Sequence, residues 1–407
     1  MRFAPTVSVV LLLIGAIGHI PVALVMGLIG VMLELGQLVW RSRGIQAVDY
    51  VRHLERNRVG WGEEVPLTIE VWNRTGLPLS WLEADDESAH GVTVAGRPPV
   101  AAERADNVIT NVWSLAPSER VFRPVRLTTD RRGVYALGPV RLTGGDLFAR
   151  PTTVDERGRV DRFLVRPRVV AAPTLARPDR WGDLDRARSG LSEDPSRFAG
   201  IRPWVPGDSL RRIHPRASAR LGRPMSKRFE PSRERNVLIA LDVQTSSWTW
   251  EGAAEPDEVE ALYVVAASLA TSLERDKAAF GIIAAGYALA RRRLAEVAVS
   301  GAPGQAGRVL DLLARLQTVP SAPYERVLET VRRTVSPNTV VVALTARDPS
   351  RFFGRLRALE RAGSRVVVLA SGADADAHAG AARSAGFVAR TARLDGPWRA
   401  ARELVVA

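Results

Sequence analysis

The chain has 407 residues, more than a single domain of roughly 100–200 residues would use. Its 46% hydrophobic and 25% charged residues exclude a disordered or low-complexity protein. The absence of cysteine excludes disulfides, thiolate metal sites and cysteine nucleophiles. No two histidines are close enough in the sequence for a metal pair of the His-x₃-His type, so a zinc enzyme is not expected; the histidines are His19, His53, His90, His214 and His378.

The chain is strongly basic, with a net charge of +13 and an isoelectric point near 11.1. Such a charge is typical of proteins that bind nucleic acid. The basic residues are almost all arginine, because Lys227 and Lys277 are the only lysines. This bias, together with abundant Ala and Val, indicates a GC-rich coding sequence. The place where the charge is concentrated therefore says more about function than its total.

The N-terminal segment has no charged residue from Phe3 to Leu33. One unbroken helix over this run would be about 46 Å long, well beyond a hydrocarbon core of ~30 Å. Glycine and proline in the turn signal at residues 18–21 divide the run. We therefore expect two transmembrane helices, at about residues 3–18 and 21–40.

Arginine flanks this run on one side at Arg2 and on the other at Arg41 and Arg43. Positive flanks at both ends of a hairpin place both ends in the cytoplasm. The sequence thus predicts that residues 1–44 form a transmembrane hairpin in the cell membrane and that the soluble part is cytoplasmic. A cleaved signal peptide and a single membrane span are the alternatives for this segment.

A strand-rich domain is expected at residues 45–170. Polar and apolar residues alternate at residues 64–72, as they do in a half-buried strand, and again at residues 121–127. Short strands separated by turn residues favour an antiparallel β-sandwich of immunoglobulin type. The core of this sandwich is expected to contain Trp61, Trp72, Trp81 and Trp113.

The pattern changes at residues 236–407, where apolar runs alternate with amphipathic helices. Residues 237–241 are continuously apolar, as parallel strands buried on both faces are, and residues 339–344 are expected to form another buried strand. A helix begins near Pro256, and a shorter alternating strand at residues 287–296 suits an antiparallel edge. This alternation predicts a doubly wound α/β domain.

Oxygen-bearing side chains follow two of the predicted parallel strands. Asp242 and Ser246 come after the first strand, and Thr345 comes after the later one. Sheets of this class bind ligands at the carboxyl ends of their strands, and carboxylate and hydroxyl oxygens are ligands that Mg²⁺ accepts. Asp242 and Ser246 are therefore the candidate metal ligands. The alternative is that they fix the turn or cap the next helix.

The arrangement resembles a von Willebrand factor A-type domain, in which Asp-x-Ser-x-Ser, a loop threonine and a later aspartate hold a divalent metal. Asp242 and Ser246 keep two of these positions, whereas Gln244 replaces the middle serine. Ala346 stands where the later aspartate is expected, and Ser321 is the nearest match to the threonine. The resemblance therefore implies a degenerate site, so that no cofactor is expected and Mg²⁺ is the one metal left open.

The most specific segment lies in residues 171–235, which link the two soluble domains. Residues 197–235 contain eleven basic and three acidic residues, a net charge of +8. Because the guanidinium fork suits carboxylates and phosphates, the segment is expected to join the two domains, to dock a partner protein, or to bind nucleic acid or anionic lipid. The candidate residues are Arg197, Arg202, Asp208, Arg211, Arg212, Arg216, Ser218 and Arg220.

This segment closely resembles the hallmark of a membrane-anchored bacterial family, domain of unknown function 58. The family pattern is an arginine, Pro-Gly-Asp, Arg-x-Ile-Asp-Trp and then Ser-Ala-Arg. His214-Pro215 replaces the Asp-Trp pair. The resemblance implies a von Willebrand A-like C-terminal domain and a partner of the MoxR-type AAA+ ATPases, beside which family members are typically encoded. The matching residues are Pro206-Gly207-Asp208, Arg211 or Arg212, Ile213 and Ser218-Ala219-Arg220.

The sequence has no Gly-x₄-Gly-Lys-Ser/Thr phosphate loop and no Gly-x-Ser-x-Gly nucleophile elbow. We therefore expect no enzyme but a membrane-anchored scaffold or adaptor that docks a MoxR-type AAA+ ATPase or a client protein. The alternative is a membrane-tethered binder of nucleic acid or anionic lipid, which rests on the +8 segment alone. A metal-dependent enzyme that acts through Asp242 is the third hypothesis.

Overall fold

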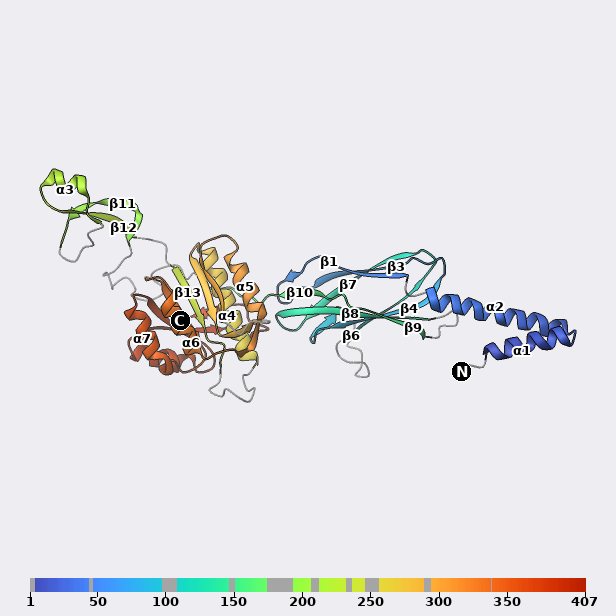
Figure 1. The fold of residues 1–407 in the computed structure, drawn as a ribbon. Helices are drawn as coiled ribbons and strands as arrows, with labels where there is room; N and C mark the ends of the chain where they lie inside the picture. Colours follow the sequence, from blue (N-terminus) through green and yellow to red (C-terminus); the bar gives the residue numbers. More distant parts are fainter. Residues whose placement is uncertain are drawn as a thin grey trace. The chain divides into compact units, whose positions relative to one another are not determined.

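A computed structural model gives the fold and describes residues 4–43, 47–96, 108–145, 151–173, 193–205, 212–231, 236–245, 256–288, 294–337 and 339–407. The chain divides into two compact units, residues 1–165 and 166–407 (Figure 1). Each unit has its own sheets and its own hydrophobic core.

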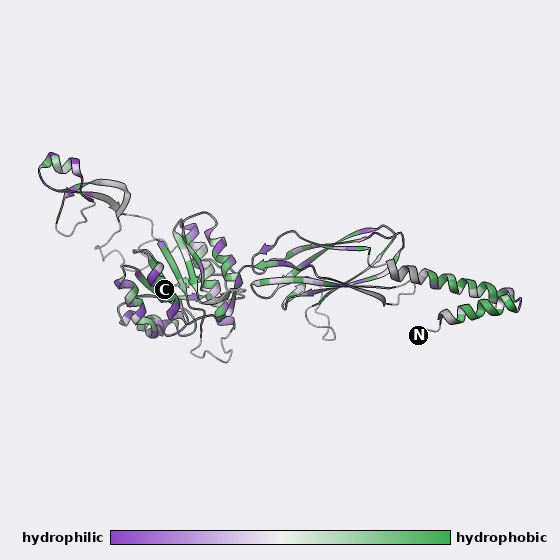
Figure 2. Cartoon of the chain, viewed as in Figure 1, coloured by the Kyte–Doolittle hydropathy of each residue, from purple (hydrophilic) through white to green (hydrophobic). Residues whose placement is uncertain are grey.

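The first unit begins with two helices, α1 (Ala4–Ile17) and α2 (Pro21–Arg43), which are largely hydrophobic (Figure 2). Glycines lie where the helices meet. A Cβ on Gly15 would lie 2.3 Å from the backbone nitrogen of Leu24, and one on Gly27 would lie 2.5 Å from that of Leu12. The absence of a side chain at these positions lets the two backbones approach closely.

The predicted transmembrane hairpin is corrected by the structure. In the described part of the chain, no helix is both long and apolar enough to span a bilayer. Helix α1 has 14 residues and is about 21 Å long, which is short of a ~30 Å hydrocarbon core. In α2, Glu34 interrupts the uncharged stretch and accepts a hydrogen bond from Ser8 Oγ at 3.1 Å. Two membrane spans, and the cell-membrane location that rested on them, are therefore not supported.

Two sheets follow in the first unit (Figure 1). One is antiparallel with the order β1-β3-β7-β5, and the other has the order β2-β10-β8-β4-β6 with β9 paired to β8. The strands of the first sheet are β1 (Val48–Leu54), β3 (Val65–Asn73), β7 (Arg120–Thr129) and β5 (Val92–Val94). Those of the second are β2 (Arg58–Val59), β10 (Asp161–Val165), β8 (Gly133–Gly145), β4 (Leu79–Ser88), β6 (Val108–Leu115) and β9 (Pro151–Arg157).

Residues of both sheets form the core of the first unit. Along β6, the buried side chains of Ile109, Trp113 and Leu115 alternate with exposed ones, because successive side chains of a strand point to opposite faces. Trp61 is partly buried against this core. Trp72 differs from the prediction, since its ring is half-buried and lies 4.2 Å from the guanidinium carbon of Arg74.

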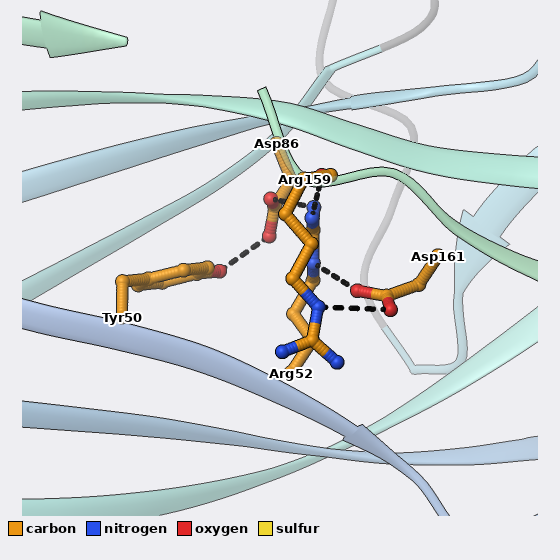
Figure 3. A network of polar contacts seen from close by, with 5 residues as sticks. All are labelled: Tyr50, Arg52, Asp86, Arg159 and Asp161. Atoms are coloured by element: carbon orange, nitrogen blue, oxygen red, sulfur yellow. Dashed lines mark hydrogen bonds and ion pairs between the residues drawn. The ribbon is translucent and has the colours of Figure 1, made fainter. Parts of the chain in front are cut away.

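A buried ionic network connects the two sheets (Figure 3). Arg52 of β1 donates from Nη1 to Asp86 Oδ1 of β4 at 2.7 Å and from Nε to Asp161 Oδ2 of β10 at 3.0 Å. Tyr50 Oη donates to the other oxygen of Asp86, and Arg52 Nη2 donates to the carbonyl of Arg159. Burial raises the pKa of Asp86. The hydrogen bond from Tyr50, together with the charge and hydrogen bond of Arg52, opposes that rise.

The second unit is built around a seven-stranded sheet of order β16-β14-β13-β18-β19-β20-β21. The five central strands are parallel and the two edge strands are antiparallel to their neighbours. The strands are β16 (Ala295–Ser300), β14 (Ala279–Ala284), β13 (Asn236–Leu241), β18 (Val340–Thr345), β19 (Arg365–Ala370), β20 (Val388–Leu394) and β21 (Leu404–Val406). The antiparallel edge strand β16 thus lies later than the predicted residues 287–296.

Helices connect these strands and pack on the sheet, and they are α4 (Pro256–Arg275), α5 (Gln305–Arg315), α6 (Tyr324–Thr334), α7 (Phe353–Arg361) and α8 (Ala375–Ser384). Apolar residues of α6, α7 and α8 share one core with alternate residues of β13, β18 and β19. Strands β13 and β18 are apolar except for Asn236 and Thr345 at their ends, as strands with both faces covered are.

Residues 166–173 are held against the second unit by polar contacts. Arg166 Nε donates to Asp311 Oδ1 at 2.7 Å, and Arg168 donates to the carbonyls of Arg399 and Ala401 at 2.6 Å each. This segment therefore starts the second unit as an ordered element.

Candidate functional site

Asp242 is the first residue after the central strand β13, and Thr345 ends the neighbouring strand β18. The two strands run parallel, so their carboxyl ends meet at one edge of the sheet. The backbone nitrogen of Asp242 donates to the carbonyl of Leu344 at 2.9 Å, which fixes the residue to that edge. Asp242 is 2% exposed and Thr345 is 1% exposed. The sequence-based expectation that these two residues meet is confirmed.

Every oxygen of the Asp242 carboxylate has a partner in the protein. Oδ1 accepts a hydrogen bond from the backbone nitrogen of Gln244 at 3.1 Å. Oδ2 accepts one from Thr345 Oγ1 at 2.9 Å and one from Arg347 Nε at 2.9 Å. Arg347 Nη2 lies 2.9 Å from the same Oδ2. The guanidinium is thus the cation that faces this carboxylate.

Two further contacts hold Arg347 in place. Its backbone nitrogen donates to Thr345 Oγ1 at 3.0 Å. Its guanidinium carbon lies 5.0 Å from the centroid of the Phe352 ring, within the range of a cation–π contact. Tyr324 meets Phe352 edge-on at 5.1 Å and donates from its hydroxyl to the carbonyl of Ala240 at 2.9 Å. With a side chain only 8% exposed, Arg347 is a fixed internal charge.

Burial dominates the protonation of this cluster. Desolvation raises the pKa of Asp242 to about 6, although the charge and hydrogen bonds of Arg347 and the hydrogen bond from Thr345 act in the opposite direction. Desolvation also raises the pKa of the Tyr324 hydroxyl, and the nearby charge of Asp242 adds to that rise. At neutral pH, Asp242 is therefore an ion-paired carboxylate, with its lone pairs engaged by protein donors.

The described residues around Asp242 do not fit a divalent cation. Its carboxylate is occupied by Arg347, and Gln244 contributes a backbone N–H, which is a donor and not a ligand. Both carboxylate oxygens of Asp348 bind Ser350 at the start of the short 3₁₀ helix Pro349–Phe352. No cluster of three or more acidic or histidine side chains suited to a metal occurs in the described residues. Ser246, the second candidate ligand, lies outside those residues.

The described part of the arginine-rich segment folds as a hairpin with a short helix. Strands β11 (Glu193–Pro203) and β12 (Met225–Pro231) pair antiparallel, and α3 (Pro215–Leu221) lies between them in the sequence. Arg197 and Arg202 are on β11. Asp208 and Arg211 lie outside the described residues.

The family departure His214-Pro215 forms the start of α3. His214 Nδ1 accepts a hydrogen bond from the backbone nitrogen of Ala217 at 3.2 Å, which is the role of an N-cap side chain. Pro215 occupies the first turn, where its missing N–H leaves no bond unmade. Ser218 Oγ accepts from Met225 N at 2.9 Å and donates to the carbonyl of His214 at 3.0 Å, so it joins the helix to β12.

Arginines cover the outer side of this helix. Arg216 and Arg220 are exposed and stand four residues apart, which puts them on the same face of α3. Arg223, just beyond the helix, is also exposed, and none of the three makes an ion pair with a described residue. Arg202 on β11 and Arg212, just before α3, are half-buried. Arg216, Arg220 and Arg223 thus form an exposed basic surface.

Both features lie in one stretch of chain that has known relatives. Residues 200–370 match the family model described as "Protein of unknown function DUF58". The DUF58 match includes α3, Asp242 and Arg347, and it confirms the family resemblance for this part of the chain. A curated relative, the "Uncharacterized protein YeaD" of Bacillus subtilis (strain 168), is 22% identical over 236 residues. That alignment covers 58% of this chain and 55% of YeaD, so the chain spans about half the length of its relative.

Solved structures resemble parts of the chain only weakly. The alpha-2-macroglobulin of E. coli aligns with 31% of this chain and 7% of its own, at 18% identity and a TM-score of 0.22. A CARDB domain from Pyrococcus furiosus aligns with 30% of this chain and 94% of its own, at 15% identity and a TM-score of 0.20. A cohesin module from Clostridium perfringens aligns with 29% and 96%, at 11% identity and a TM-score of 0.20. Scores this low carry no argument about function.

Arg347 is the residue of this edge that the metal motif does not contain. The sequence left open whether Gln244 or Arg347 fills the place of a metal, and the structure shows that Arg347 contacts the Asp242 carboxylate.

Proposed function

We propose that this chain is a non-catalytic docking protein whose second unit binds a partner protein, with the basic surface of α3 as its contact. The parallel sheet with Asp242 at its carboxyl edge is the von Willebrand A-like domain of the resemblance. The partner is a MoxR-type AAA+ ATPase or one of its client proteins.

The Asp242–Arg347 ion pair is the observation that carries the proposal. A von Willebrand A-like domain with an open metal site presents an aspartate whose oxygens are free to bind a cation. Here both oxygens are engaged by Gln244, Thr345 and Arg347, and the guanidinium lies 2.9 Å away on Oδ2. This arrangement supports a binding role, because the Asp242 carboxylate is engaged within the protein and is not free to act as a base or a metal ligand.

The basic surface supplies the attraction for a partner. Arg216 and Arg220 on α3 and Arg223 just beyond it are exposed and unpaired within the described residues, and His214 fixes the start of the helix. Guanidinium groups bind carboxylates in a bidentate manner, and a patch of one charge steers an oppositely charged protein into contact. We therefore expect the partner to present an acidic surface.

The test uses the full tagged chain expressed in its native host. Affinity capture with and without ATP, followed by mass spectrometry, should recover an AAA+ ATPase. Titration of that purified ATPase should then show binding that weakens at least tenfold in the R216E/R220E variant. R361E, a charge reversal of an exposed arginine at the end of α7, is the matched control and should bind as the wild type does.

Two outcomes would overturn the proposal. One is that no ATPase or stable client binds, and the other is that R216E/R220E binds as tightly as the wild type. Binding of nucleic acid or anionic lipid is the competing function for the same arginines. It would appear as an affinity for a DNA duplex or for vesicles with anionic lipid that falls steeply with salt and disappears in R216E/R220E.

A further inference from the structure

The helical hairpin of α1 and α2 exposes most of the large apolar side chains on the described surface. The two helices pack against each other, and both are largely hydrophobic (Figure 2). Twenty-five large apolar residues are exposed in the described part of the chain, and sixteen of them lie between Val7 and Leu35. Monomeric proteins rarely leave so large an apolar patch in contact with water, so the hairpin needs a surface that covers it.

One side of α2 is already occupied by α1. A Cβ on Gly27 would lie 2.5 Å from the backbone nitrogen of Leu12, and Glu34 accepts the hydrogen bond from Ser8. Gly27 and Glu34 stand seven residues apart and therefore lie on the same side of the helix. Ile29 comes two residues after Gly27, which is about 200° further around the helix axis. Ile29 thus marks the side of α2 that faces away from α1.

A stripe of apolar residues runs along this second side of α2. Its members are spaced alternately three and four residues apart, as the a and d positions of a coiled coil are. The four large members are each between 52% and 68% exposed, and the stripe ends at a glycine whose added Cβ would meet nothing within 4 Å. A second helix can therefore lie along the stripe without a clash. The members are Val22, Val25, Ile29, Met32 and Gly36.

The exposed area of the hairpin is of the size that a dimer interface requires. A Val, Leu or Ile side chain removes roughly 60–120 Å² of apolar area from water when it is fully buried. The sixteen exposed residues are about half exposed, so together they offer on the order of 500–1,000 Å². Each partner in a stable protein interface contributes about 800 Å². A second copy of the hairpin therefore matches the surface that has to be covered.

We propose that the chain forms a two-fold dimer through this hairpin, with the α2 stripe of one copy packed against the α2 stripe of the other. A two-fold axis places one patch against an identical patch, and this is the commonest symmetry of homo-oligomers. The two hairpins then form a four-helix bundle in which α1 covers one side of α2 and the second copy covers the other.

The first test uses the absence of cysteine from the chain. I29C introduces a single thiol at the middle residue of the stripe, so the two thiols of a dimer lie near the axis whether the α2 helices run parallel or antiparallel. Oxidation of the purified full chain should convert most of I29C into a covalent dimer on a non-reducing gel. L24C, at a position beside Gly15 of α1, is the control and should run as a monomer.

The second test measures the mass of the full chain by sedimentation in detergent-free buffer. The wild type should have a mass near twice the 44.3 kDa of one chain. I29E places a charge in the seam and should raise the dissociation constant of the dimer at least a hundredfold. V112E, the same kind of change at an exposed valine of β6, should leave the dimer intact. Unchanged circular dichroism in both variants separates loss of the dimer from misfolding.

The proposal is overturned if the wild type sediments as a monomer, if I29C crosslinks no better than L24C, or if I29E dimerises as the wild type does. A lipid surface is the competing occupant of the same face, and flotation with phosphatidylcholine–phosphatidylglycerol vesicles tests for it. Vesicle binding with loss of the I29C crosslink in the bound fraction would assign the stripe to lipid and overturn the dimer. A crosslink that persists on the vesicles would support the dimer.

Discussion

The guanidinium of Arg347 lies on the carboxylate of Asp242, with Nε and Nη2 each 2.9 Å from Oδ2. Both side chains are almost wholly buried, at 8% and 2% exposure. A buried carboxylate needs a positive partner, and this fold supplies that partner from the loop after the next parallel strand. The charge of the Asp242 carboxylate is therefore neutralised by Arg347 without a bound ion.

The first prediction is that the protein shows no specific affinity for Mg²⁺ or Mn²⁺ at this edge. Arg347 occupies the lone pairs of Asp242 that a metal cation would use. The positive charge of its guanidinium would also repel such a cation. Isothermal titration of the full chain should give the same heats for the wild type and for D242N. A saturable heat that is present in the wild type and lost in D242N would contradict this.

The second prediction concerns the energy of the pair. R347M should destabilise the second unit by about 3–5 kcal/mol, because it leaves a buried carboxylate without its partner. The double variant D242L/R347M should recover part of that loss, since it removes both charges. Urea unfolding measures both effects. R351Q, a change at an exposed arginine nearby, is the control and should lie within about 0.5 kcal/mol of the wild type.

The third prediction follows from the raised pKa of Asp242. Its pKa is about 6 in the folded protein, compared with 3.8 as the ordinary value. Between these pH values the folded state holds a proton that the unfolded state has lost, so stability falls as pH rises from about 4 to about 6 and is constant above. The urea midpoint of the wild type, relative to D242N, should therefore fall over this window. A rise over the same window would contradict this, because it would mean that the lowering by Arg347 outweighs the effect of burial on the pKa of Asp242.

Strands and helices with strong local signals were predicted well from the sequence. The apolar runs at 237–241 and 339–344 form β13 and β18, and the helix expected near Pro256 is α4. The edge strand was misplaced, because β16 begins at Ala295 and residues 286–288 form the separate strand β15. An edge strand has one uncovered side, so its sequence carries a weaker hydrophobic pattern.

The N-terminal helices show the limit of reading hydropathy alone. The turn at residues 18–21 and the two helices on either side of it were predicted within a few residues, but α1 has only 14 residues, and Glu34 of α2 accepts a hydrogen bond from Ser8. The error was to interpret two apolar helices as two membrane spans.

The candidate site was predicted in part. The rule that parallel strand ends meet at one edge brought Asp242 and Thr345 together. It could not show that Arg347 turns back onto Asp242, because that contact depends on the path of the loop and on the ring of Phe352 beneath the guanidinium. The arginine cap and the absence of a metal cluster in the described residues are thus properties of the fold and not of the motif.

The fourth prediction concerns the start of α3. H214A should remove the acceptor for the Ala217 backbone nitrogen and destabilise the helix by about 1 kcal/mol, whereas H214D should keep it stable. Hydrogen exchange of residues 215–221 measures this, since a lost cap raises local opening. Equal exchange in H214A and the wild type would show that His214 has no capping role. Partner affinity should fall in H214A only in proportion to the fraction of molecules in which α3 is unfolded.

The fifth prediction concerns the ionic network of the first unit. R52M should destabilise that unit by about 3–5 kcal/mol, because Asp86 and Asp161 both lose a buried partner. G138A should also be strongly destabilising. Gly138 has a φ of +96°, and a Cβ there would lie 2.3 Å from the carbonyl oxygen of Arg159 and 2.6 Å from Arg52 Nη2. Urea unfolding followed through the tryptophans reports on both variants.

The control for this prediction is R126Q, which breaks the exposed contact between Arg126 and Glu64 at 3.4 Å. Its cost should be at most about 1 kcal/mol, as is usual for exposed pairs. If R52M costs no more than R126Q, the network does not hold the two sheets together. A loss in G138A is expected from the φ of +96° and from the clash with the Arg159 carbonyl alone, so R52M is the variant that tests the network.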